Sequence, residues 1–106
     1  MTVDEAVQKY STQYNVPKEL INAIIKVESS GNTYAVRYED GYRWTVKPFS
    51  QFHWHTPTEK LTQKTSWGLM QIMGAVARER GFEGRYLAEL CKPEIGVKYG
   101  VKHLKW

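Results

Sequence analysis

The sequence predicts an α+β domain that is mainly α-helical, on the evidence of two kinds of periodicity. Apolar residues recur at helical spacing in several stretches, whereas aromatic and β-branched residues alternate with polar ones between residues 34 and 46. The alternation surrounds Asp40-Gly41, a common turn sequence, and so predicts a small β-hairpin inserted between helices. At 106 residues, with 42% hydrophobic and 25% charged residues, the chain is expected to form one globular domain over residues 1–106.

Five helices are expected along the chain. Their predicted ranges are residues 3–14, 17–28, 68–80, 85–90 and 93 to the end. Pro17 and Pro93 suit the first turn of a helix, where the missing N–H of proline costs nothing. Gly31 or Asn32 is expected to end the second helix in a left-handed conformation, and Gly81 is expected to end the third.

A segment rich in aromatic residues and histidine separates the hairpin from the third helix. Pro48 and Pro57 bound this segment, Phe49 to His55, which is expected to be a loop forming a lid or a cleft wall. His53 and His55 would share one face of an extended chain, but no third ligand follows at a suitable spacing. The sequence therefore predicts no metal site. Three tryptophans suit either sugar stacking or core packing: Trp44, Trp54 and Trp67.

The net charge of the chain indicates which kinds of partner it is expected to bind. A net charge of +4 favours an anionic partner, but the basic residues are spread out, which argues against nucleic acid. Arg78, Arg80 and Arg85 are expected to form a solvated face. No apolar run is long enough to span a membrane, and the N-terminus lacks the pattern of a signal peptide. The single cysteine, Cys91, excludes an internal disulfide and is expected to be a small core residue.

Glu28 is the main candidate for a catalytic residue. It follows Ile21 by seven residues and Ile24 by four, so it lies on the apolar face of the second helix, at the end of that helix. A carboxylate there is expected to be partly desolvated and close to the negative end of the helix dipole, and both effects favour the protonated acid. A glutamic acid that is protonated near neutral pH can act as a general acid. The alternative is that Glu28 faces water or pairs with a lysine or arginine.

The segment from Ser66 to Met73 is the second informative stretch. Gly68 lets the backbone approach a neighbour closely at the expected start of a helix. Gln71 offers a donor and an acceptor for an acetamido group or a sugar hydroxyl, and Met73 is a pliable apolar contact. The alternative is that the apolar residues belong to the core and Gln71 is a surface residue.

Together these segments resemble the soluble lytic transglycosylase family, the bacterial and phage enzymes that cleave the glycan strands of peptidoglycan. The matching pieces are Glu28-Ser29-Ser30-Gly31-Asn32, Gly68-Leu69-Met70-Gln71-Ile72-Met73, and the stretch from Pro93-Glu94 through Gly100 to His103-Leu104. Residues 34–39 are similar to a hairpin variant common in phage and prophage members, so the resemblance covers the chain from about Val16 onward. It implies a lysozyme-like fold of the goose type.

The resemblance also implies the chemistry. The Glu-Ser motif of the family carries its acid/base, which is Glu28 here. The acid protonates the glycosidic oxygen between N-acetylmuramic acid and N-acetylglucosamine, and the carboxylate then accepts a proton from the muramoyl C6 hydroxyl, which closes an anhydro ring. Gln71 and Met73 are expected to contact the glycan, and Ser29 and Tyr38 are further candidates. No metal or cofactor is expected.

Glu39 is the candidate for a second acid. A glycosidase with paired carboxylates needs one across the cleft, and Glu39 lies in the predicted hairpin. If Glu39 faces Glu28 across a water molecule, hydrolysis as in goose-type lysozymes becomes the expected reaction. The alternative, which we favour, is that Glu39 is an exposed hairpin residue.

The chain departs from the family pattern at several points. Gly74 stands where the family usually has proline, and Gly96 and His103 stand where asparagine and tyrosine are common. The Ala-Tyr-Asn-Ala-Gly block, whose tyrosine helps to form the active site of the family, does not occur in this sequence. Another chain that completes the cleft is one expectation that follows.

The preferred function is therefore a lytic transglycosylase that binds peptidoglycan glycan strands at the bacterial cell wall, in the periplasm or delivered by a phage. A module that binds the wall without cleaving it is the alternative in another class, and its main support is the missing tyrosine block. A small nucleic-acid-binding domain rests on charge and aromatic content alone.

Overall fold

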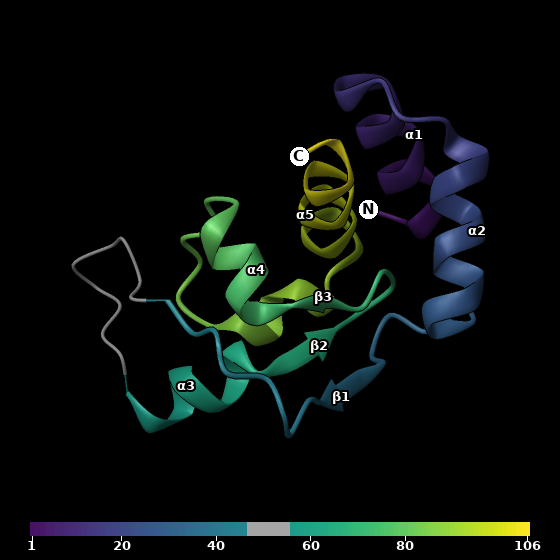
Figure 1. Cartoon of the computed structure of the whole chain (residues 1–106). Coiled ribbons are helices and arrows are strands. Elements are labelled where there is room, and N and C mark those ends of the chain that lie inside the picture. Colours follow the sequence, from purple (N-terminus) through teal and green to yellow (C-terminus); the bar gives the residue numbers. More distant parts are fainter. Residues whose placement is uncertain (47–55) are drawn as a thin grey trace.

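Helices make up most of the secondary structure, and a small antiparallel sheet lies beside them (Figure 1). The computed structural model describes residues 1–46 and 56–106. Its helices are α1 (Val3–Tyr14), α2 (Lys18–Ser29), α3 (Pro57–Gln63), α4 (Gly74–Glu79), the 3-10 helix η1 (Leu87–Cys91) and α5 (Pro93–Lys105). Its strands are β1 (Val36–Tyr38), β2 (Thr65–Trp67) and β3 (Ile72–Met73). The predicted mainly helical α+β class is confirmed.

Two further expectations from the sequence concern a loop and the absence of a membrane span. The expected loop from Phe49 to His55, with Trp54 and the histidine pair, lies outside the described residues. Within residues 1–46 and 56–106, no helix combines the length and the apolar character that a membrane span requires.

Helix α1 has the predicted bounds because both of its ends are capped. The Thr2 hydroxyl accepts a hydrogen bond from the Glu5 N–H at 3.1 Å, and the Glu5 carboxylate accepts one from the Thr2 N–H at 2.8 Å. This reciprocal capping box pairs two N–H groups that the helix itself leaves free. At the other end Asn15 takes a left-handed conformation with φ of 54° and stops the helix.

Helix α2 buries one face and ends within a residue of the predicted position. Ile21 and Ile25 are buried, whereas Leu20 is 47% exposed. Ser30 forms the left-handed cap with φ of 53°, and Gly31 follows with φ of 81°. Gly31 is left-handed, as predicted, but the prediction that Gly31 or Asn32 caps the helix is wrong, because Ser30 supplies the cap.

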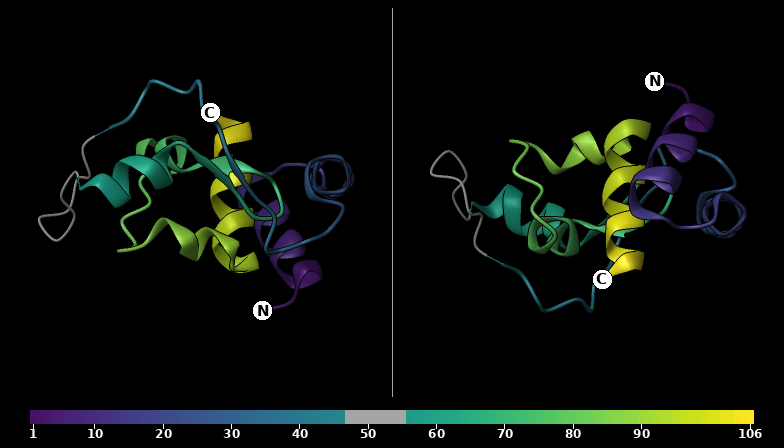
Figure 2. Two further views of the ribbon diagram at one scale, coloured as in Figure 1. Left: turned by 90° about the horizontal axis from the view of Figure 1, so that it is seen from below. Right: turned by 90° about the horizontal axis from the view of Figure 1, so that it is seen from above.

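Two apolar clusters form the core. The first joins α1, α2 and α5 to the turn after β2, and its buried members are Ala6, Val7, Tyr10, Val16, Ile21, Ile25, Leu69, Met70, Val97 and Val101. The second joins the sheet to α4 and η1 through Trp67, Ile72, Ala77, Phe82, Leu87 and Leu90. Figure 2 shows α1 lying along α5 in both views, with α2 beyond it. Helix α5 thus contacts both clusters.

The hairpin predicted around Asp40-Gly41 is wrong, although the turn is present. The Tyr42 N–H donates to the Glu39 carbonyl at 3.1 Å, as in a β-turn, but residues 42–46 form no strand. Strand β1 pairs instead with β2, with Val36 opposite Trp67, and β2 pairs with β3. The buried strand β2 offers β1 a partner anchored in the core, which a local hairpin could not provide.

The helix predicted from Gly68 to Arg80 is also wrong in its first half. Gly68 has φ of 71° and Gln71 has φ of 50°, so these residues form a turn that joins β2 to β3. Helix α4 begins only at Gly74 and ends near Gly81, as predicted. Apolar spacing alone did not distinguish a helix from a short buried strand followed by a helix.

Close backbone contacts explain two of the departures from the family pattern. A Cβ atom on Gly74 would lie 2.3 Å from the Thr62 carbonyl oxygen of α3, and one on Gly96 would lie 2.3 Å from the Leu90 carbonyl oxygen. Any larger residue at either position would collide with backbone that cannot move aside easily. Helix α5 begins at Pro93, as predicted, and η1 ends at Cys91.

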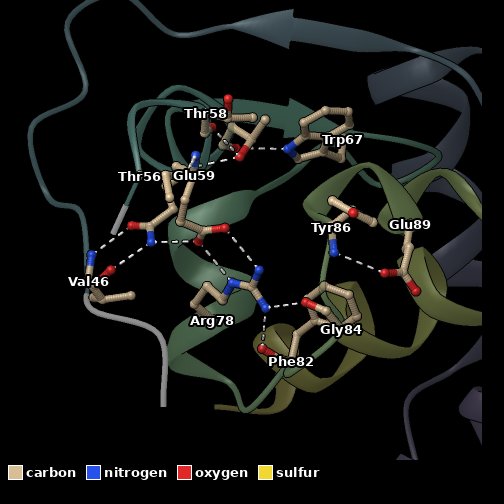
Figure 3. Close-up of polar contacts among 12 residues, drawn as sticks. Val46, Thr56, Thr58, Glu59, Trp67, Arg78, Phe82, Gly84, Tyr86 and Glu89 are labelled. Atoms are coloured by element: carbon tan, nitrogen blue, oxygen red, sulfur yellow. Dashed lines mark hydrogen bonds and ion pairs between the residues drawn. The ribbon is translucent and has the colours of Figure 1, made fainter. Parts of the chain in front are cut away.

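Arg78 is buried, which corrects the prediction that it lies on a solvated face. Its side chain is 1% exposed and forms an ion pair with Glu59 of α3, with Nε 3.0 Å from Oε2 and Nη2 3.0 Å from Oε1 (Figure 3). Nη1 donates to the carbonyls of Phe82 at 3.0 Å and Gly84 at 2.7 Å. A guanidinium that is satisfied in this way joins α3, α4 and the chain after α4.

Gln63 extends this network to the end of the segment that follows β1. Its Nε2 donates to Glu59 Oε2 at 2.8 Å and to the Val46 carbonyl at 2.6 Å. Its Oε1 accepts from the Val46 N–H at 2.7 Å, so the side-chain amide pairs with the backbone as a neighbouring strand would (Figure 3). This pairing holds Val46 against α3 and replaces the strand contact that the sequence predicted.

We expect Arg78→Met to lower the free energy of unfolding by about 3–5 kcal/mol, because it leaves the Glu59 carboxylate buried without its partner. Chemical denaturation measures the change. Arg85→Met is the matched control, since Arg85 is exposed, and it should change stability by less than about 1 kcal/mol. Equal effects of the two substitutions would contradict the role given to the buried pair.

We expect Gly74→Ala to destabilise the fold by about 1–3 kcal/mol, because the added methyl group collides with the Thr62 carbonyl oxygen. Thermal unfolding of the two proteins measures this loss. At Gly41 a Cβ atom would meet nothing within 4 Å, so Gly41→Ala serves as the control and should be nearly neutral. A neutral Gly74→Ala would show that α3 and α4 are not in close contact.

Candidate active site

Glu28 lies in the last turn of α2, one helical turn after Ile24 and on the same face. In Figure 1 the C-terminal end of α2 extends past α1 toward the chain that leads into β1. Glu28 is exposed there, so the expectation of a partly desolvated carboxylate is wrong for this chain, and the alternative that Glu28 faces water holds. The reason is that the buried residues of the helix, Ile21 and Ile25, lie in earlier turns. An exposed carboxylate at this end can be reached by a polymer.

Ser29 has a structural role at the end of α2. Its hydroxyl donates to the Ile25 carbonyl at 3.1 Å and accepts from the Gly31 N–H at 3.2 Å. The first bond joins the side chain to the preceding turn of its own helix, and the second pairs the N–H of a residue just beyond the helix end. The hydroxyl is therefore engaged with its own helix and fixes the chain directly after Glu28.

The turn between β2 and β3 is tied to the segment between α2 and β1. The Ala35 carbonyl accepts from the Gly68 N–H at 2.8 Å and from Gln71 Nε2 at 2.9 Å. Gln71 Nε2 also donates to the Gly68 carbonyl at 2.9 Å. The amide nitrogen of Gln71 thus holds the turn, and among the described residues no hydrogen bond is formed by its Oε1. That oxygen is left as an acceptor for a ligand.

A pocket of about 180 Å³ lies beside this turn, between α2, the sheet, α4 and α5. Most of its wall is apolar, and the lining residues are Ile24, Met70, Gln71, Ile72, Met73, Val76, Gly100, His103 and Leu104. It contains both residues predicted to bind the glycan from the second informative segment, Gln71 and Met73. Ile24 brings the face of α2 that carries Glu28 to the edge of the pocket.

Glu39 and Tyr38 lie on the sheet side of this region. Glu39 Oε1 is 3.2 Å from Arg37 Nε and 3.4 Å from the Ser66 hydroxyl, which also lies 3.1 Å from Met73 Sδ. Ser66 therefore links Glu39 to Met73 across the sheet. Tyr38 is 47% exposed at the end of β1. Neither residue is among those that line the pocket.

Several pocket residues were missed by reasoning from the sequence. Met70 is buried under Gly100, where a Cβ atom would lie 2.5 Å from the Met70 Sδ. His103 and Leu104 reach the pocket only because α5 crosses the sheet end, and no local pattern in the sequence signals this packing. Ile24 could have been found, because it precedes Glu28 by one helical turn.

No group of three or more metal-binding side chains occurs within residues 1–46 and 56–106. His53 and His55 lie outside that part of the chain. Burial raises the pKa of the Cys91 thiol, which keeps this side chain in its unreactive protonated form and fits the predicted core role. The polar side chains that line the pocket are the Gln71 amide and the His103 imidazole, and the Glu28 carboxyl group lies one helical turn beyond Ile24 of its apolar wall.

Comparison with known proteins identifies the family. The model of the transglycosylase SLT domain matches residues 5–106. The chain belongs to this family. The family predicted from the Glu28 and Gly68 motifs is thereby confirmed over nearly the whole chain, whereas the predicted phage-like origin stays a prediction.

A curated relative agrees with this assignment. "Membrane-bound lytic murein transglycosylase E" of Buchnera aphidicola subsp. Baizongia pistaciae (strain Bp) is 55% identical to this SLT domain over 42 residues, 39% of this chain and 20% of the relative. The match thus covers about a fifth of the length of that relative. No solved structure matches the chain significantly.

We expect Gln71→Glu to destabilise the SLT domain by about 1–3 kcal/mol, because a carboxylate oxygen would replace the donor that contacts the carbonyls of Ala35 and Gly68. Thermal or chemical unfolding measures the loss. Gln13→Glu makes the same chemical change on the exposed face of α1 and should be close to neutral. If both variants are as stable as the wild type, Gln71 does not hold the turn.

Proposed function

We propose that this chain is the catalytic domain of a peptidoglycan lytic transglycosylase, with Glu28 as its single acid/base. The observation that carries the proposal is the position of Glu28 one helical turn beyond Ile24, a residue that lines the same pocket as Gln71 and Met73. The family and the name of the relative support the same reaction.

In the proposed reaction a glycan strand lies across the pocket and covers Glu28. The carboxylic acid donates its proton to the glycosidic oxygen between N-acetylmuramic acid and N-acetylglucosamine as the bond to the muramoyl C1 breaks. The Glu28 carboxylate then accepts the proton of the muramoyl C6 hydroxyl while the C6 oxygen bonds to C1. Water is not consumed, and Glu28 returns to its protonated form. Exclusion of water by the bound strand favours this internal attack over hydrolysis.

The pocket would supply binding and orientation. Ile24, Met73 and Val76 offer an apolar wall for the face of a sugar ring, and Gln71 Oε1 can accept the N–H of an acetamido group. Ser29 contributes indirectly, since its two hydrogen bonds fix the end of α2. In this proposal Glu39 is held by Arg37 and Ser66 and takes no part in proton transfer.

The proposed place of action is the bacterial cell wall, either in the periplasm or after delivery by a phage. The net charge of +4 favours association with an anionic wall. The contribution of another chain to the cleft remains a prediction from the sequence.

We expect Glu28→Gln to lower the rate of peptidoglycan cleavage by about 10³-fold, because glutamine can neither donate nor accept the required proton. Release of soluble fragments from dye-labelled peptidoglycan measures the rate, and sedimentation with the insoluble wall measures binding, which should persist. Glu19→Gln, an exposed residue at the start of α2, is the matched control and should keep wild-type activity.

Two results would contradict the proposal. Cleavage by Glu28→Gln near the wild-type rate would remove Glu28 from the chemistry. A wild-type protein that binds the wall but releases no fragments would assign the chain to the non-catalytic binding modules.

A further inference from the structure

A basic and aromatic rim borders the pocket at the end of α5. Arg80 follows Val76 by one turn at the end of α4, and its Nε donates to His103 Nδ1 at 3.3 Å. His103 and Val76 both line the pocket. The Arg80 guanidinium carbon lies 3.9 Å from the centroid of the Trp106 ring, which is 80% exposed. Arg80, His103 and Trp106 are called the rim below.

The charge of the rim is not neutralised by the chain itself. Among residues 1–46 and 56–106, neither of the two ion pairs involves Arg80, and only its Nε forms a hydrogen bond to another side chain. Lys102 and Lys105 flank His103 on α5 and add positive charge. The terminal nitrogens of Arg80 are thus available to a ligand, in contrast to those of Arg78, which both donate hydrogen bonds within the chain.

A guanidinium with two free terminal nitrogens recognises planar oxyanions, above all carboxylates, through two parallel hydrogen bonds. Its stacking on Trp106 orients the plane of the group and leaves most of the ring open to an apolar neighbour. The rim therefore suits a ligand that carries a carboxylate close to an apolar chain.

We infer that the rim binds a carboxylate of the peptide stem on the muramoyl residue, and so makes the domain prefer strands that carry stems. The inference rests on the proposed function, since it assumes that the glycan lies in the pocket. It favours the stem over other anions because the stem is bonded to a sugar of the strand. The rim borders the pocket through His103, so the stem of a sugar bound there extends within its reach.

The test compares glycan strands that bear stems with strands stripped by an amidase. The specificity ratio is kcat/KM on the first divided by kcat/KM on the second. Arg80→Gln should lower this ratio about tenfold, as expected for the loss of one charge-assisted contact. Arg85→Gln, which removes the same charge from an exposed arginine stacked on Tyr86, should keep the wild-type ratio. A ratio unaffected by Arg80→Gln, even with a lower overall rate, would make Arg80 a structural residue and overturn the inference.

A binding measurement separates failure of this inference from failure of the proposed function. An NMR titration of the wild type with a soluble muramoyl dipeptide should shift the signals of the rim, and Arg80→Gln should lose most of that shift. This result would support the rim even in a protein without activity. Inorganic phosphate that binds the rim when the muramoyl dipeptide does not would overturn the inference. Cleavage of glycan with no rim shift would leave the proposed function intact and the inference wrong.

Discussion

The buried ion pair between Arg78 and Glu59 is the contact on which the sheet side of this domain depends. The Arg78 side chain is 1% exposed, and burial of its charge is tolerated because its N–H groups donate hydrogen bonds to carboxylate and carbonyl oxygens. It fixes α3 against α4, and through Gln63 it fixes Val46 as well. Helix α4 begins at the residue after Met73, so the same pair sets the position of one wall of the pocket.

The pocket lies where the two apolar clusters meet, and a single carbonyl joins its two sides. Ile24 and Met70 belong with the cluster of α1, α2 and α5, whereas Ile72 and Val76 belong with the cluster of the sheet and α4. The Ala35 carbonyl accepts hydrogen bonds from Gly68 and Gln71 and so holds the chain after Glu28 to the turn of the sheet. This contact helps to hold the proposed proton donor in a fixed position relative to the proposed sugar-binding wall, as acid catalysis requires.

What could be predicted from the sequence was governed by local interactions. The bounds of α1 and the starts of α2 and α5 follow from caps, prolines and helical spacing, all of which lie within a few residues. The predicted hairpin is wrong because β1 pairs with β2, which lies far along the chain: Val36 pairs with Trp67, 31 residues later. The burial of Arg78 was missed for the same reason, since its partner Glu59 lies on another helix.

In the candidate site, too, local features were predicted from the sequence and long-range contacts were not. Gln71 and Met73 were found from a short motif, and the structure brings them into one pocket. Glu28 was placed on the correct helix face, but its exposure depends on how far α2 extends beyond the core. His103 and Arg80 could not be found from spacing, because only the packing of α5 against α4 brings them together.

The most direct test of the central claim is to cleave purified peptidoglycan in water labelled with oxygen-18 and to weigh the fragments. Internal attack by the C6 hydroxyl predicts anhydro-muramoyl ends that are lighter by one water than reducing ends and contain no solvent oxygen. Reducing ends that carry the heavy oxygen would contradict the account. They would show that water is the nucleophile and would bring Glu39 back as the second carboxylate.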